Sequence, residues 1–136
     1  MKHLAVVLLF ALAGAPALAQ KTIVDGNVLD DSCRYERLRE SGTKLFPDVD
    51  AIGKASFCIG YIRAVLDEIW MQQNFPDELG VKNVGRQKIC MSADIKNEQA
   101  LKVAIKYLQD NPAKLQFPAS SVIRLSMEEA FPCKSP

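Results

Sequence analysis

The longest periodic pattern of hydrophobic residues in this chain runs from residue 51 to residue 73. Apolar side chains recur there every three or four residues, and charged side chains fall mostly on the other side of the helical wheel. The apolar positions are Ile52, Ala55, Ile59, Ile62, Leu66 and Ile69. The pattern predicts a central helix about 35 Å long. Asp48 or Asp50 is placed to cap its start, and Pro76 ends it because proline cannot donate the next backbone hydrogen bond.

Three shorter stretches show the same helical spacing. The first begins at Asn27, whose side chain can act as an N-cap, and ends at Ser41-Gly42. The other two span about residues 97–110 and 118–130, each bounded by a proline. We find no confident strand pattern, no internal repeat and no low-complexity tract. The sequence therefore predicts an all-α fold, a small bundle of about four helices, in a single domain over residues 20–136.

The first nineteen residues have the layout of a secretory signal. Lys2 and His3 precede an uninterrupted apolar run over residues 4–13, and Ala17-Leu18-Ala19 places small residues where signal peptidase reads them. The apolar run is too short to span a membrane, which takes about 20 residues. We therefore predict a signal peptide cleaved after Ala19 and a soluble periplasmic protein with no membrane segment. The alternative left open is an N-terminal membrane anchor that is never cut.

Removing this segment changes the charge and the available chemistry. The whole chain has 17 Lys and Arg against 16 Asp and Glu, and Lys2 is the one cation in the removed segment, so the mature chain is neutral. Neutrality argues against nucleic acid or an anionic membrane as partner. The only histidine is His3, so the mature chain lacks the usual base of nucleophilic catalysis. We therefore expect neither an enzyme nor a metal or cofactor site.

Four cysteines remain in the exported part: Cys33, Cys58, Cys90 and Cys133. An even number in a small exported domain predicts two disulfides, for which three pairings exist. If the first two helices fold back about the loop near residue 45, Cys33 and Cys58 come to the same level. A turn at residues 112–117 likewise brings Cys90 near Cys133. We therefore expect the pairs Cys33–Cys58 and Cys90–Cys133.

Two features of the central helix bear on its packing. Glycine inside a helix costs about 1 kcal/mol relative to alanine. We therefore expect Gly60 to permit the close approach of a neighbouring helix, with Tyr61 as a ring at the edge of the core. Trp70 and Met71 could form an exposed patch or belong to the core, and we favour the core.

Several short motifs in this order resemble the Rap/Tai family of periplasmic immunity proteins. The motifs are Cys58-Ile59-Gly60-Tyr61-Ile62, Cys90 before an amphipathic helix, Lys106-Tyr107-Leu108 followed by Asn111-Pro112, and Ala130-Phe131-Pro132-Cys133. The resemblance covers about residues 27–134. It implies a small, secreted, helical and disulfide-bonded protein that binds and blocks a peptidoglycan amidase delivered by type VI secretion. Related proteins act as dimers in some cases, so a homodimer is a further implied partner, although no apolar stripe in the sequence is clear enough to derive one.

Inhibition by occlusion needs no catalytic residue, but it does need a rigid segment that fits a cleft. The connection from Phe75 to Lys88 is our candidate for that segment. In it, Phe75 can anchor an interface, and charged residues can pair with a cleft rim. The candidate partner-binding residues are Phe75, Asp77, Glu78, Lys82 and Arg86. An ordinary solvated loop is the alternative for this stretch.

A second hypothesis comes from a different class of protein. Small periplasmic structural or stress proteins, including chaperone-like ones, also use helices pinned by disulfides, so the physical features overlap. A neighbouring gene for a secreted cell-wall hydrolase, and binding of that hydrolase, would favour the immunity protein over this alternative.

Overall fold

The computed structural model describes residues 23–42, 48–76 and 88–133. It contains four α-helices and one short 3₁₀ helix. They are α1 (Gly26–Glu40), α2 (Val49–Asn74), α3 (Asn97–Asp110), η1 (Pro112–Lys114) and α4 (Ala119–Ala130). The described residues form no strand, only two isolated backbone bridges. The predicted all-α bundle is confirmed. The predicted signal peptide lies outside the described residues.

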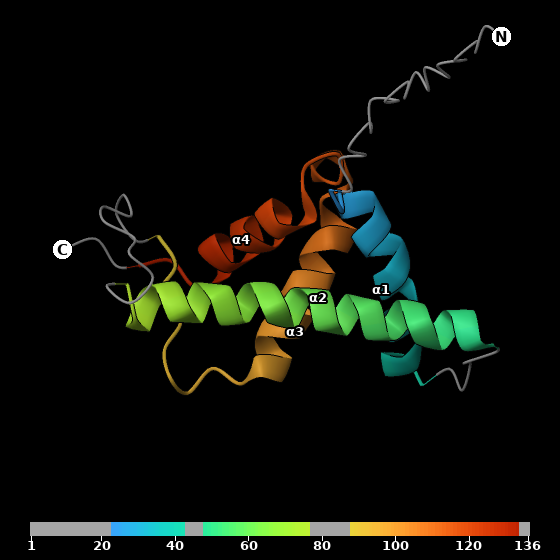
Figure 1. Ribbon diagram of the computed structural model, residues 1–136, viewed down its shortest axis with the longest axis horizontal. Helices are drawn as coiled ribbons and strands as arrows, with labels where there is room; N and C mark the ends of the chain where they lie inside the picture. Colours follow the sequence, from blue (N-terminus) through green and yellow to red (C-terminus); the bar gives the residue numbers. More distant parts are fainter. Residues whose placement is uncertain (1–22, 43–47, 77–87, 134–136) are drawn as a thin grey trace, which may run out of the picture.

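The helices pack as two pairs, α1 with α2 and α3 with α4, and each helix also contacts both helices of the other pair. Figure 1 shows α2 lying across the other three helices, with α1 near its beginning and α4 toward its end. The central position predicted for this helix is therefore correct. No helix in the described part of the chain is long and apolar enough to cross a membrane.

The helix ends follow local hydrogen bonding. The Asp25 carboxylate accepts from the backbone N–H of Val28 at 3.0 Å and caps α1, and Asp48 does the same for α2 through Ala51 at 2.8 Å. The prediction of Asp48 is confirmed, whereas that of Asn27 is wrong. Asn27 lies inside α1, and its side-chain amide donates instead to the carbonyl of Leu115 at 3.0 Å.

The buried face of α2 is shifted by about one residue at its beginning from the face that the sequence predicts. Ala51, Ala55 and Cys58 are buried there, while Ile52 is half exposed. The cause is the disulfide between α1 and α2, which holds two Cα atoms 5.0 Å apart and leaves room for small side chains only. Farther along, Ile62, Leu66 and Ile69 are buried as predicted and contribute to one continuous hydrophobic core.

Both predicted disulfides are present. Cys33 pairs with Cys58, and Cys90 pairs with Cys133. The first links α1 to α2 inside the core. The second links the chain just before α3 to the chain just after α4, as expected for two helices that turn back on each other.

The close backbone approach in this fold occurs at Gly26 and not, as predicted, at Gly60. A Cβ atom on Gly26 would lie 2.7 Å from the Cα of Leu115, whereas one on Gly60 would meet nothing within 4 Å. Gly60 faces solvent, so the prediction was wrong about which glycine lies under a neighbouring segment. Gly26 begins α1 where the N-terminal segment pairs with the η1–α4 turn, through hydrogen bonds from Gly26 N–H to Phe117 and from Ala119 N–H to Val24, both 2.9 Å.

Candidate interaction surface

Only the two ends of the predicted partner-binding segment lie within the described residues. Phe75 is the C-cap residue of α2, and Lys88 forms an ion pair with Glu128 of α4 at 3.1 Å. Asp77, Glu78, Lys82 and Arg86 lie outside the described residues. The structure therefore fixes where this segment leaves α2 and where it rejoins the fold.

Three large hydrophobic side chains are exposed at the end of α2, where this segment begins. Trp70 is 48% exposed, Met71 36% and Phe75 38%. The Trp70 and Phe75 rings contact each other with centroids 5.4 Å apart and planes tilted by 56°. We call Trp70, Met71 and Phe75 the aromatic end of α2. Tilted aromatic pairs of this kind combine a large apolar area with a defined geometry.

The expectation that Trp70 and Met71 belong to the core is wrong. Ile69 takes the buried position on this turn of α2, with 2% exposure. Successive side chains on a helix point about 100° apart, so Trp70 is turned away from the core that Ile69 faces. The sequence holds one signal for this outcome, because Trp70 lies only about a turn before the predicted helix end at Asn74, where packing neighbours become fewer.

Hydrogen bonds hold the aromatic end in place. The Asn74 side-chain amide donates to the carbonyl of Trp70 at 2.8 Å, and the Phe75 N–H donates to the carbonyl of Met71 at 2.8 Å. The side-chain amide of Gln73, the residue before Asn74, donates to the carbonyl of Ile89 at 2.6 Å. This last bond joins the end of α2 to the stretch just before Cys90.

The stretch around Cys90 is in turn fixed to the end of α4. Cys90 N–H donates to the carbonyl of Phe131 at 2.8 Å, and Cys133 N–H donates to the carbonyl of Lys88 at 3.1 Å. The Cys90–Cys133 disulfide closes the same junction. Phe75 and Lys88, the two ends of the predicted partner-binding segment, are thus both attached to helices or to the disulfide junction. A segment held at both ends loses less conformational entropy when it binds.

Charged side chains of α2 and of the stretch before α3 form ion pairs with α4. Glu68 of α2 contacts Arg124 of α4 at 2.9 Å, and Lys88 contacts Glu128 of α4 at 3.1 Å. The aromatic end itself contains no titratable side chain. Apolar rings with charged residues around them are the usual composition of a protein–protein interface, in which aromatic residues supply much of the binding energy.

The titratable groups with a shifted pKa lie elsewhere on the surface. A hydrogen bond to Asp31 and the nearby charges of Asp31 and Asp50 raise the pKa of Lys54. A hydrogen bond from Ser92 lowers the pKa of Asp94. In the described part of the chain, no three His, Cys, Asp or Glu side chains gather in a way that could hold a metal ion. The aromatic end is therefore suited to binding and offers no arrangement for acid–base chemistry.

A known protein family matches this chain. The family model of the Rap1a immunity proteins matches residues 25–133, which span all four helices and both disulfides. No curated protein and no solved structure matches the chain.

Proposed function

Because the chain belongs to the Rap1a immunity protein family, we propose that it is a periplasmic immunity protein that binds and occludes a peptidoglycan amidase delivered by type VI secretion. Immunity proteins act by binding a secreted effector, so the partner of this chain is a protein. Two disulfides suit the oxidising periplasm, and the signal-like residues 1–19 supply a route to it.

The observation that carries the proposal is the exposed Trp70–Phe75 pair at the base of the segment between residues 76 and 88. Solvent exposure of a tryptophan that packs on a phenylalanine leaves apolar area uncovered in the free protein. In the proposed complex the two rings pack against the rim of the amidase cleft, and the segment that follows them enters the cleft. Substrate is then excluded by volume, with no chemical step on the inhibitor.

Replacing the tryptophan tests this arrangement. Trp70→Ala should weaken binding of the amidase by about 2 kcal/mol, or about 30-fold in Kd, because buried tryptophans are frequent hot spots of protein interfaces. The measurement is isothermal titration calorimetry with a secreted cell-wall amidase, the first candidate being any that is encoded beside the gene for this chain, together with inhibition of its activity.

Phe117→Ala is a matched control for this experiment. Phe117 is 44% exposed and lies in the turn between η1 and α4, away from the aromatic end. The Phe117→Ala variant should bind the amidase with a Kd within about twofold of the wild-type value. An equal loss for both variants, or no loss for Trp70→Ala, would place the interface elsewhere. Failure of the wild-type protein to bind any such hydrolase would favour the structural or chaperone-like alternative.

The charged residues of the segment are part of the same proposal. Asp77 and Glu78 are proposed to pair with basic groups at the cleft rim, and Lys82 and Arg86 with acidic ones. Replacing Asp77 and Glu78 together by alanine should weaken amidase binding and leave the melting temperature unchanged. An unchanged affinity would remove these two carboxylates from the interface.

A homodimer, also part of this proposal, would use a different apolar surface. Val28 of α1 and Val49 and Phe57 of α2 line one hollow toward the beginning of α2 and are all at least 40% exposed. We propose that a second copy of the chain covers this surface, since monomeric proteins rarely expose large apolar patches. Sedimentation equilibrium should give a dimer for the wild-type protein and a monomer for Phe57→Glu. A wild-type monomer at micromolar concentration would contradict it.

A further inference from the structure

A groove with an excess of positive charge lies between α1 and α3, outside both surfaces described above. It has a volume of about 420 Å³. Residues three or four positions apart on a helix lie on the same face. The groove is lined by such residues from each of the two helices. They are Arg34, Arg37, Leu38 and Glu40 of α1 and Lys102, Ile105, Lys106 and Gln109 of α3. We call this hollow the α1–α3 groove.

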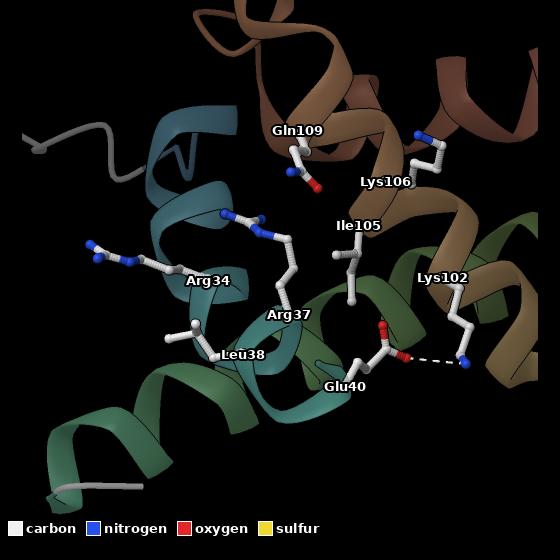
Figure 2. A pocket seen from close by; sticks show the side chains of 8 residues that line it. All are labelled: Arg34, Arg37, Leu38, Glu40, Lys102, Ile105, Lys106 and Gln109. Carbon is white, nitrogen blue, oxygen red and sulfur yellow. Dashed lines mark ion pairs between the residues drawn. The ribbon is translucent and has the colours of Figure 1, made fainter. Parts of the chain in front are cut away.

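Figure 2 shows how these side chains are arranged. Arg37 and Gln109 lie at one end of the groove, and the Glu40–Lys102 ion pair lies at the other, with Ile105 between them. Arg34 and Leu38 also line the groove, but in this view they extend from α1 on the side away from Ile105. Ile105 is buried and Leu38 is half-buried, so the groove has an apolar floor with cations around it.

Counted over its lining residues alone, the groove has an excess of positive charge, although Asp30 and Asp110 outside the lining pair with Arg37 and Lys106. Four of its lining residues are cations and one, Glu40, is a carboxylate. The neighbouring hollow lined by Glu36, Arg39, Glu40, Arg63, Glu98 and Lys102 has three charges of each sign. Because the mature chain is neutral, this excess reflects the placement of charges and not the overall composition.

Three of the four cations of the groove form ion pairs, and Arg37 is the least exposed of these, held by Asp30 at 2.7 Å. Arg34 is exposed and forms no ion pair with any described residue. Lys102 and Lys106 contact Glu40 at 3.2 Å and Asp110 at 2.7 Å, but their side chains are 66% and 75% exposed. Exposed ion pairs contribute little free energy, so these lysines can exchange a neighbouring carboxylate for one from a ligand at small cost.

From this geometry we infer that the α1–α3 groove binds an acidic segment of a protein partner, one that carries an apolar side chain flanked by carboxylates. The apolar side chain packs on Ile105, and the carboxylates contact Arg34, Lys102 and Lys106. The side-chain amide of Gln109 can accept a hydrogen bond from the backbone of such a segment or donate one to it. A polyphosphate chain fits less well, because Glu40 would repel it and the apolar floor would stay unfilled.

The inference does not depend on the identity of the immunity partner, because it is defined by the chemistry of the groove alone. The probe is a synthetic capped peptide of sequence Glu-Asp-Leu-Glu-Asp, titrated into the ¹⁵N-labelled, disulfide-intact mature protein. We expect chemical-shift changes at the amides of Arg34, Leu38, Ile105 and Gln109. The affinity should fall at least about fivefold when salt is raised from about 20 to about 200 mM, because the attraction is screened.

Charge-reversal variants separate a built site from general attraction. Arg34→Glu combined with Lys106→Glu should weaken peptide binding at least about tenfold. Lys114→Glu, an exposed lysine of η1 outside the groove, is the matched control and should change it less than about twofold. The circular dichroism spectra of both variants should match that of the wild-type protein, because all three positions are exposed.

Three results would overturn the inference. They are the absence of shift changes at millimolar peptide, equal weakening by Lys114→Glu, and tighter binding of a single-stranded oligonucleotide of the same length at the same amides. Trp70→Ala should leave peptide binding unchanged, so failure of the groove and failure of the aromatic end are distinguishable outcomes.

Discussion

The two helix pairs of this protein are each closed by one disulfide, but the two bonds lie in opposite environments. Cys33 and Cys58 are both 0% exposed, between Leu29 and Ile62 in the hydrophobic core. Cys90 is exposed and Cys133 is half-buried, at the junction that also holds the aromatic end. The first bond is therefore part of the core, while the second joins two segments beside the surface that we propose binds the effector.

Loop size and burial make opposite predictions about which bond stabilises the fold more. The bonds close loops with sequence separations of 25 and 43 residues. Chain entropy alone then favours the second bond, about 4 against about 3.5 kcal/mol. Deleting two buried sulfur atoms costs about 2 kcal/mol in addition, because each removed core atom loses its burial and leaves a cavity. Burial outweighs the difference in loop size.

The largest expected effect is therefore the loss of the buried bond. Cys33→Ala combined with Cys58→Ala should lower the free energy of unfolding by about 5.5 kcal/mol, and Cys90→Ala combined with Cys133→Ala by about 4 kcal/mol. Urea denaturation of the two double variants measures both values. A smaller loss for the Cys33 and Cys58 variant would mean that loop closure, and not burial, separates the two bonds.

Gly26 lies where the two helix pairs meet, and substituting it tests the close packing there. Gly26→Ala should destabilise the protein by about 2 kcal/mol, because the new methyl group would press on the backbone of Leu115, which cannot move aside as a side chain can. Gly60→Ala is the matched control within α2. It should stabilise the protein by about 0.5–1 kcal/mol, since its methyl group meets open space and alanine favours the helix.

Urea denaturation again measures both glycine variants. Equal effects of the same sign would show that close packing at the start of α1 is not what joins the two helix pairs.

Access to reductant should also distinguish the disulfides. Under limited reduction, Cys90 and Cys133 should be alkylated at least about tenfold faster than Cys33 and Cys58, because thiol–disulfide exchange needs access to a sulfur atom. Peptide mapping after alkylation gives the two rates. Labelling of all four cysteines at one rate would mean that reduction waits for global unfolding in both pairs.

The smallest effect concerns Tyr107, which lies on α3 and faces α4. Burial, and then the charge of Glu129, raise the pKa of Tyr107 above its ordinary value of 10.0. The folded state holds this proton more tightly, so the stabilisation is fully present below about pH 10 and is lost as pH rises through the raised pKa. Between about pH 9 and about pH 11, the wild-type protein should lose more stability than Tyr107→Phe. Parallel losses in urea denaturation would contradict this assignment.

Features set by local sequence could be predicted for this fold. Pro76 ends α2 and Asp48 begins it, because both residues act on backbone hydrogen bonds within their own turn of the helix. The disulfide pairing followed from two helices turning back on each other, which needs only helix lengths and loop positions.

Features set by neighbouring elements could not be predicted. Ile52 and Ala51 share one turn, and only the close passage of α1 decides that the smaller side chain is buried. Gly60 and Gly26 likewise differ through what lies opposite each of them. At the candidate interface, Phe75 was predicted from its place at the helix end, but the exposure of Trp70 depends on where α2 extends beyond its neighbours.

Hydrogen–deuterium exchange with and without the proposed amidase partner tests most directly whether the aromatic end is the binding surface. Bound amidase should slow exchange in peptides covering residues 70–90 and leave residues 49–57, at the other end of α2, unchanged. Slowed exchange at residues 49–57 alone, with none around Trp70 and Phe75, would contradict the assignment of the aromatic end as the surface that contacts the effector.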